Sequence, residues 1–356
     1  MSTPDALVAT IALFDGFDIA LSSAEVWMYC AAYQEKSYSL SQVEGLLSAD
    51  NRLECTNGLW TLAGRTDLAR IRVVRGFPVH ERWAIAGRAA CLAALVPFLQ
   101  LFAVCNTFGY GVAKEDSDID VFVVALHRRL WTVRFLLTVM LHVLRLRRHG
   151  SRIAKRICLS FFVATDSLCM APLSLFLEPI PLFPDPSGGA TQEAPDPYLA
   201  WWVGSVIPLV DRGAYADFIT ANRPFIERYR KEFTPRLPPP SVIASPAKSL
   251  SERSPEGRQS NAHDVIPSRA EGSRLASITE YFLSGRLGDG VESLLCFIQL
   301  RKIARSSIGK HRENPTSVVV SDHVLKFHEN DRRAAIRDQW IERLAELGIA
   351  FGNLKS

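Results

Sequence analysis

The spacing of apolar positions changes along the chain and predicts a different type of element in each part. In the first 65 residues, apolar stretches lie near 7–14 and 22–32, and a third stretch, opened by Ser39, places Leu40, Val43, Leu46 and Leu47 at helical spacing. These patterns predict three helices. The stretch LECTNGLWTL then places Asn57-Gly58 between two short apolar runs, which indicates a hairpin with a two-residue turn.

Three helices followed by a hairpin resemble a winged-helix domain, so we expect a winged-helix-like domain over residues 1–65. Such domains often bind DNA through the third helix, and DNA binding depends mostly on neutralising phosphates. Residues 1–65 hold three Lys or Arg against eight Asp or Glu, a net charge of −5. The third helix carries Glu44 and no basic residue before Arg52. We therefore predict no DNA binding by this segment and favour a packing or protein-contact role.

The middle of the chain predicts a small mixed sheet with helices packed on it. A helical pattern covers about 66–101. Strand-like runs follow at 101–105, 118–125 and 157–164, and a helix is expected at about 130–144 between the last two. This order indicates an α/β fold of the α+β kind. It combines a small mixed-sheet core, the N-terminal winged-helix-like domain and C-terminal helices.

The rest of the chain predicts helices separated by segments rich in Pro, Gly or Ser. Two helices are expected at about 198–210 and 215–233, and helical patterning returns at 277–308 with a turn at Gly288 and Gly290. Seven prolines and seven serines between positions 234 and 269, with few large apolar residues, predict disorder. The expected segments are a winged-helix-like domain (1–65), a core (66–178), a loop and helical region (179–233), a disordered insertion (234–275) and a C-terminal helical region (276–356).

The stretch NTFGYGVAKEDSDIDVFVV, residues 106–124, carries the candidate chemistry. Asp118 and Asp120 occupy alternate positions at the start of an apolar strand, so their side chains point to the same face. Two neighbouring carboxylates raise each other's pKa unless a cation or hydrogen-bond donors hold them ionised. A divalent metal ion is the obvious candidate for that cation, and the alternative is two solvated acids at the start of a strand.

This stretch resembles the signature of the nucleotidyltransferase superfamily, which has the DNA polymerase beta-like fold. In that signature a strand ends in Gly-Ser, and a turn of about ten residues leads to a D-x-D pair that opens the next strand. Thr107 stands at the Ser position, Gly111 at the second turn glycine, and Asn106 replaces the usual Gly. The N-terminal segment and LKFHENDRR near the C-terminus are similar to uncharacterised prokaryotic nucleotidyltransferase-domain proteins.

The resemblance implies a Mg²⁺-dependent enzyme that moves a nucleoside monophosphate from a nucleoside triphosphate to an acceptor, which the sequence does not identify. Asp118 and Asp120 would hold Mg²⁺ as metal ligands and catalytic residues, since carboxylates suit this hard cation. The nucleotide-binding residues it implies are Asn106, Thr107, Gly111 and Ser117.

The same resemblance leaves a second function open. Many relatives carry a third carboxylate on the following strand, where this chain has Cys158 and Ser160, and the nearest acid is Asp166. The alternative is therefore a catalytically degenerate core that acts as a nucleotide-binding or protein-interaction module. The identity of the residues on the 157–164 strand favours this alternative, whereas the intact Asp118 and Asp120 pair favours the enzyme.

Basic residues concentrate around this stretch. Residues 66–160 hold fifteen Lys or Arg against six Asp or Glu, a net charge of +9, which suits a phosphate-bearing partner or a solvated loop. LKFHENDRR either closes over the site and contacts phosphates, or caps a terminal helix. Trp201 and Trp202 are predicted to be core residues rather than a surface for base stacking.

Cysteine usage and hydropathy bear on the compartment. The seven cysteines are scattered and form no C-x-x-C pair, which predicts reduced thiols and a cytoplasmic protein. Residues 1–12 lack the basic and apolar pattern of a secretion signal, so we expect an unprocessed N-terminus. The apolar stretch Ala89 to Cys105 is shorter than the roughly 20 residues that span a bilayer, and we predict no membrane span.

Overall fold

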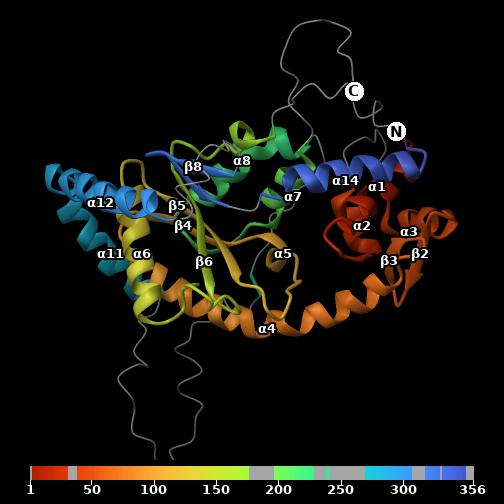
Figure 1. Ribbon diagram of the computed structural model, residues 1–356, viewed down its shortest axis with the longest axis horizontal. Coiled ribbons are helices and arrows are strands. Elements are labelled where there is room, and N and C mark those ends of the chain that lie inside the picture. Colours follow the sequence, from red (N-terminus) through yellow and green to blue (C-terminus); the bar gives the residue numbers. More distant parts are fainter. Residues whose placement is uncertain are drawn as a thin grey trace, which may run out of the picture.

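The computed structural model of the chain describes residues 2–30, 38–175, 196–227, 238–239, 269–306, 317–328 and 331–349. In these ranges helices and two separate sheets combine into a mixed α/β structure (Figure 1). The fold class predicted from the sequence is confirmed at this level. The predicted insertion and the Pro-rich loop before position 196 lie outside the described residues, apart from a helix that begins at Arg269.

The N-terminal part consists of three helices and a small antiparallel sheet with strand order β1-β3-β2. Its elements are α1 (Thr3–Asp15), β1 (Leu21–Ser22), α2 (Ser23–Tyr29), α3 (Leu40–Ala49), β2 (Leu53–Thr56) and β3 (Leu59–Leu62). Ser22 and Ser39 close capping boxes that start α2 and α3. The predicted hairpin is present. Asn57 and Gly58 both take positive φ angles, 54° and 77°, as a two-residue turn between right-handed strands requires.

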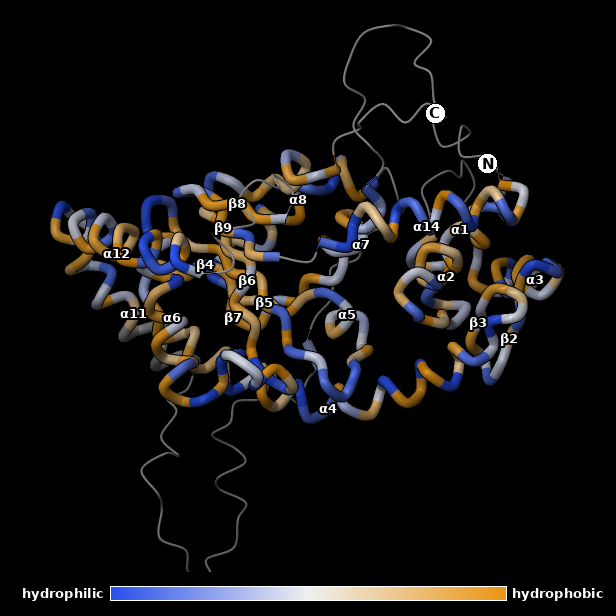
Figure 2. The backbone as a smooth tube through the Cα atoms, in the orientation of Figure 1, coloured by the Kyte–Doolittle hydropathy of each residue, from blue (hydrophilic) through white to orange (hydrophobic). Residues whose placement is uncertain are grey.

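A six-stranded sheet with strand order β7-β4-β5-β6-β9-β8 forms the centre of the molecule. Its strands are β4 (Leu99–Val104), β5 (Ile119–Ala125), β6 (Ile157–Ala164), β7 (Ile207–Asp211), β8 (Val318–Val320) and β9 (Val324–Phe327). Among the strands that the structure describes, only β5 and β6 pair in parallel, and the helix between them provides the crossover that a parallel pair needs. The central strands are hydrophobic along their length (Figure 2), because helices cover both faces of the sheet.

The helices form one layer on each face of the six-stranded sheet. They are α4 (Asp67–Ala93), α5 (Asn106–Gly109), α6 (Leu130–Val143), α7 (Pro197–Ser205), α8 (Ala214–Glu227), α11 (Arg269–Leu283), α12 (Arg286–Ala304), α14 (Arg333–Glu346) and a 3-10 turn, Ala171–Leu173. Alternate strand residues such as Phe102 and Val123 pack with α4, α6 and α12. Their neighbours, such as Phe122 and Val124, pack with α7, α8 and the N-terminal helices.

Two helices connect the N-terminal part to the sheet. The long helix α4 runs from beside β3 to the sheet and to α6 (Figure 1). The C-terminal helix α14 lies against α1 and α7, and the Trp340 indole N–H donates to the Ala9 carbonyl at 2.9 Å. Arg343 of the same helix forms an ion pair with buried Asp15 at 3.1 Å. Residues more than 300 positions apart therefore share one core.

The structure corrects the sequence prediction at three places. The stretch that ends at Val210 was predicted to be helical throughout, but α7 stops at Ser205 and β7 follows as an edge strand. Gly288 and Gly290 do not form the predicted turn, since both lie inside α12 and the break falls before it, at Ser284 and Gly285. Finally, α11 begins at Arg269, so its first seven residues lie within the predicted insertion. None of the helices in the described ranges combines the length and apolar character needed to cross a membrane.

Candidate functional site

The candidate site begins where β4 ends, at Asn106. Asn106 adopts a φ of 60°, a left-handed conformation that Asn tolerates better than most residues with a side chain. Its backbone N–H donates to the Ser205 hydroxyl at 2.8 Å, and its side-chain Nδ2 donates to Asp120 Oδ2 at 2.7 Å. The short helix α5 packs closely on α7 here, because a Cβ at Gly109 would lie 2.0 Å from the Ser205 carbonyl oxygen. Asn106 thus links the turn to the carboxylate strand.

A buried arginine of α4 holds the turn that leads to the carboxylates. The Arg82 side chain is fully buried, and its Nη2 donates to the backbone carbonyls of Lys114, Glu115 and Ser117. Hydrogen bonds from a guanidinium to several carbonyls fix a loop that has no regular structure. Sequence reasoning missed this residue, since a single arginine in a helical pattern gives no signal of what it contacts. Arg82 is a positioning residue for the site.

Asp118 and Asp120 converge as predicted, and Cys158 joins them. Asp120 pairs in register with Cys158 across the parallel strands β5 and β6. The ligand atoms of Asp118, Asp120 and Cys158 all lie within 4.8 Å of one another. Arg148, from the basic loop before β6, donates to Asp118 Oδ2 at 2.7 Å. In this structure, the repulsion between the two carboxylates is therefore reduced by the Arg148 guanidinium beside Asp118 and by the Asn106 amide beside Asp120.

The environment of Asp120 holds its pKa above the ordinary value. Burial raises the pKa of this carboxyl to about 6, and the charge of Asp118 adds to the effect. Hydrogen bonds from Asn106 and Cys158 and the charge of Arg148 act in the opposite direction and are outweighed. Burial and the two carboxylates also raise the pKa of the Cys158 thiol well above its usual range. Cys158 is therefore a neutral thiol at neutral pH.

A cavity of about 270 Å³ opens beside this cluster. It is lined by residues of the motif turn, of the turn after α1, of α7, and of the C-terminal segment that leads into α14. Five cationic side chains and three acidic ones face it: Arg75, Lys114, Lys326, Arg332 and Arg333, with Asp18, Asp120 and Asp331. This excess of positive charge suits an anionic ligand. Burial lowers the pKa of Lys326 to about 8, so that this amine is still mostly protonated at neutral pH.

Three side chains of the cavity wall hold a buried polar atom that lacks a hydrogen-bond partner within the described part of the chain. These atoms are Asn106 Oδ1, Trp201 Nε1 and His328 Nδ1. A buried polar atom left without a partner costs about 1 to 3 kcal/mol. One acceptor, one donor and one imidazole nitrogen around the same space indicate a polar occupant that would satisfy them.

The structure brings most of the predicted site residues together. Asn106, Thr107, Ser117 and Asp120 line the cavity, and Asp118 lies in the carboxylate cluster beside it. Gly111 does not line the cavity. It has a φ of 72° in the turn after α5, which a glycine adopts without strain.

Two further predictions concern residues outside the motif. Trp201 and Trp202 are each 4% exposed and belong to the core, as predicted. Lys326, His328, Asp331 and Arg332 of LKFHENDRR line the cavity. Asp331 and Arg332 also immediately precede α14, so the two alternatives for this segment are compatible in space.

Asp166 does not complete the carboxylate cluster. It follows Ala164, the last residue of β6. Ala164 lies six residues after Cys158 on this strand, which corresponds to about 20 Å at 3.3 Å per residue. There it contacts His127 and His323 instead. The position beside Asp120 that a third carboxylate would take is occupied by Cys158.

The donor atoms of the cluster are compatible with Mg²⁺. Asp118 and Asp120 offer hard carboxylate oxygens, and Mg²⁺ in nucleotide sites is commonly held by one or two carboxylates together with substrate phosphates and water. The unpartnered Asn106 Oδ1 adds a further hard oxygen nearby. The neutral thiol of Cys158 is a poor ligand for Mg²⁺.

Comparison of the chain with protein-family models, with curated proteins and with solved structures finds no match. The functional argument therefore rests on the motif and on the geometry around it.

The raised pKa of Asp120 predicts a pH-dependent stability when metal is absent. Because the folded protein protonates this carboxyl near pH 6 and the unfolded chain only near 3.8, its contribution to the free energy of unfolding rises as the pH falls through 6. The gain levels off once both states are protonated. We expect urea denaturation in EDTA between pH 8 and 5 to show this rise in the wild type and a flatter profile in Asp120→Asn. Parallel profiles would contradict the assignment.

Proposed function

We propose that the protein is a Mg²⁺-dependent nucleotidyltransferase that transfers a nucleoside monophosphate from a nucleoside triphosphate to an acceptor. The observation that carries this proposal is the contact between the motif turn and the carboxylate strand. The Asn106 amide donates to Asp120 at 2.7 Å at the wall of a cavity that Thr107 and Ser117 also line. Hydroxyl, amide and carboxylate groups that lie apart in the sequence thus face one space.

The roles of the residues follow from their chemistry. Asp118 and Asp120 would hold Mg²⁺, which when bound neutralises charge on the phosphates and the leaving group. Thr107 and the backbone of the turn after β4 would bind phosphate oxygens. Lys326 and Arg332 would supply positive charge from the opposite wall. Arg148, now paired with Asp118, has to give up that contact when a cation takes its place.

One observation favours the second candidate function, a degenerate core that binds nucleotide without transferring it. Cys158 stands beside Asp120 on β6, and its thiol is neutral and offers no hard oxygen. A site with two carboxylates has less negative charge to hold two metal ions than a site with three. Nucleotide binding is common to both functions, and only the release of pyrophosphate separates them.

Nucleotide binding is therefore the first experiment. We expect calorimetric titration of the full chain with ATP, GTP, CTP and UTP to show at least one nucleotide that binds more tightly in Mg²⁺ than in EDTA. We expect Thr107→Val to weaken that binding about 10- to 100-fold, since a hydrogen bond to a charged group contributes about 1.5 to 3 kcal/mol.

The control is Thr220→Val, which makes the same change on the exposed side of α8, far from the motif in sequence. Equal nucleotide binding by Thr107→Val and Thr220→Val would contradict the proposed role of Thr107. If no nucleotide binds the wild type in Mg²⁺, the transferase and the nucleotide-binding form of the degenerate core are both wrong, and of the second candidate only the protein-interaction module is left. Binding without pyrophosphate release in the presence of a broad set of acceptors would favour the degenerate core.

A further inference from the structure

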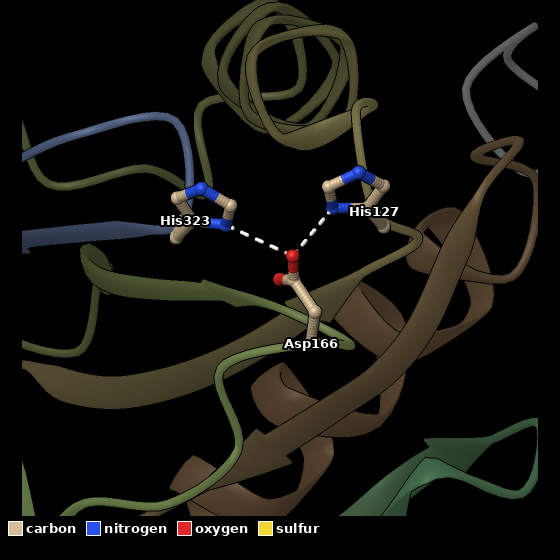
Figure 3. A group of neighbouring side chains, drawn as sticks. All are labelled: His127, Asp166 and His323. Atoms are coloured by element: carbon tan, nitrogen blue, oxygen red, sulfur yellow. Dashed lines mark ion pairs between the residues drawn. The ribbon is translucent and has the colours of Figure 1, made fainter.

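A second cluster of ligating side chains lies at the opposite end of β6 from the carboxylates. His127 follows β5, Asp166 follows β6, and His323 directly precedes β9. Asp166 Oδ2 lies 2.6 Å from His127 Nδ1 and 3.0 Å from His323 Nδ1. Figure 3 shows both imidazoles pointing toward the same carboxylate oxygen. The rings lie nearly parallel, at 26°, with their centroids 5.8 Å apart.

The backbone holds these three residues in place. Strands β5, β6 and β9 are neighbours in the sheet, so the three chain segments meet at one edge. The His127 N–H donates to the Thr165 hydroxyl at 3.0 Å, and the Ala164 N–H donates to the His323 carbonyl at 2.8 Å. The Ser321 hydroxyl accepts the backbone N–H groups of both His323 and Val324. The cluster is therefore built on strand ends and a short turn rather than on a long loop.

Charge alone does not account for this arrangement. The side chains of His127, Asp166 and His323 are 47%, 36% and 51% exposed, and ion pairs with such exposure contribute between 0 and about 1 kcal/mol. Two imidazoles nevertheless share one carboxylate oxygen, with no other acid in the cluster. Burial alone would raise the pKa of Asp166. The hydrogen bond with His323 and the charges of both imidazoles outweigh burial, so that the pKa lies below its ordinary value.

We propose that His127, Asp166 and His323 bind a divalent transition-metal ion, and that Zn²⁺ is the ion that fits them best. Imidazole and carboxylate ligands suit Zn²⁺, at distances of about 2.0 to 2.2 Å. A tetrahedral ion at such distances separates its ligand atoms by about 3.3 Å. The three ligand atoms here already lie within 4.8 Å of one another. The distances from Asp166 Oδ2 to His127 Nδ1 and to His323 Nδ1 would have to lengthen by about 0.7 and about 0.3 Å to admit the ion.

Binding exchanges protons for metal. Each Nδ1, which now lies beside the Asp166 carboxylate, has to offer its lone pair to the ion, so any proton on that nitrogen is displaced. Metal binding that displaces ligand protons weakens in acid. Three protein ligands leave the fourth position of the ion open to water or to a partner group. The metal would join the ends of β5, β6 and β9.

The test is a calorimetric titration of the full, EDTA-treated and desalted chain with Zn²⁺ in the presence of millimolar Mg²⁺, which competes for the carboxylate cluster. We expect one equivalent to bind, and we expect His127→Ala with His323→Ala to weaken binding at least about 100-fold. Zn²⁺ should raise the melting temperature of the wild type and leave that of this variant unchanged.

Two controls separate this site from others. His142→Ala with His149→Ala removes a second pair of neighbouring histidines, whose ring centroids lie 5.2 Å apart, and should bind Zn²⁺ like the wild type. Asp118→Asn with Asp120→Asn should do the same, which also distinguishes this site from the proposed nucleotidyltransferase centre.

Co²⁺ gives an independent readout. Bound at His127, Asp166 and His323 it should lack the sulfur charge-transfer band that Cys158 would produce. Absence of Zn²⁺ binding, or equal binding by the wild type and by His127→Ala with His323→Ala, would overturn the proposal. Should that variant not fold, Asp166→Asn takes its place, and unchanged affinity in it has the same meaning.

Discussion

Replacing both motif carboxylates, by Asp118→Asn with Asp120→Asn, is expected to abolish the difference between nucleotide binding in Mg²⁺ and in EDTA. The fold should be retained. The Asn106 amide can still donate to the side-chain oxygen of the new residue at 120, so the link between turn and strand survives. Calorimetric titration of the variant with each nucleotide, with and without metal, measures the loss directly.

The same variant should be more stable than the wild type when metal is absent. The pKa of Asp120 is raised to about 6, so at neutral pH the ionised carboxylate lowers the free energy of unfolding. A shift of about 2 pH units corresponds to about 3 kcal/mol, and the lost pair between Arg148 and Asp118 offsets up to about 1 kcal/mol. We expect the free energy of unfolding in EDTA at pH 7.5 to rise by about 2 to 3 kcal/mol.

The matched control changes two neighbouring acids of the same turn. Glu115 and Asp116 are exposed, and neither lines the cavity. Glu115→Gln with Asp116→Asn removes the same formal charge and should leave nucleotide binding in Mg²⁺ unchanged. If the control loses the Mg²⁺ effect as fully as Asp118→Asn with Asp120→Asn, the effect comes from overall charge and the metal site is wrongly placed.

Local patterns in the sequence predicted those elements that are determined locally. The strand over 157–164 matches β6 at both ends, because a short, nearly continuous apolar run with Ile157, Phe161, Phe162 and Val163 is typical of a strand that is buried on both faces. Asn57-Gly58 gave the hairpin, since both positions need positive φ. The convergence of Asp118 and Asp120 followed from the period of a strand.

The errors fall where local pattern and tertiary contact compete. The five residues of β7 directly follow a helix, and a short apolar run after a helix has no period of its own to distinguish it. Gly288 was read as a turn, but it lies in α12 where a Cβ would meet the Leu283 carbonyl at 1.7 Å. A glycine that permits close packing and a glycine that permits a turn look the same in the sequence.

The contacts that build the site were also beyond sequence reasoning, because they join distant segments. Arg82 contacts carbonyls more than 30 positions further along, and Ser205 accepts the Asn106 N–H from 99 positions away. Whether Asp166 completes the carboxylate cluster was left open by the sequence. The structure answers this question, because Asp166 follows the end of β6 that lies away from Cys158, and the two ends of a strand are far apart.

The largest loss of stability is expected from Arg333→Met, because Arg333 holds two buried acids. Its side chain is 4% exposed, and its guanidinium contacts Asp331 at 2.8 Å and Asp196 at 3.3 Å. It also donates to the Leu173 carbonyl. Asp196 is fully buried and begins α7 by accepting the Leu199 N–H at 2.8 Å. Arg333 thus ties the start of α14 to the start of α7.

Removing the guanidinium leaves the buried carboxylates of Asp196 and Asp331 without the positive charge that Arg333 supplies. Breaking a buried ion pair by removing one partner costs about 3 to 5 kcal/mol, and we expect the free energy of unfolding at pH 7.5 to fall by that amount. The comparison is Arg223→Met, which removes an exposed pair with Glu227 on α8 and should cost no more than about 1 kcal/mol. Similar losses in the two variants would show that the buried network adds nothing beyond a surface pair.

The pH dependence of Arg333→Met provides a second check on the same argument. Burial already raises the pKa of Asp196, and the charge of Arg333 opposes that rise. Without Arg333 the folded-state pKa of Asp196 moves further above that of the unfolded chain, so the variant regains stability as the pH falls through it. We expect the stability difference between wild type and variant to be smaller at pH 5 than at pH 7.5. Because Asp331 and Arg333 also line the cavity, we expect the variant to weaken nucleotide binding as well, which links the stability of α14 to the proposed activity.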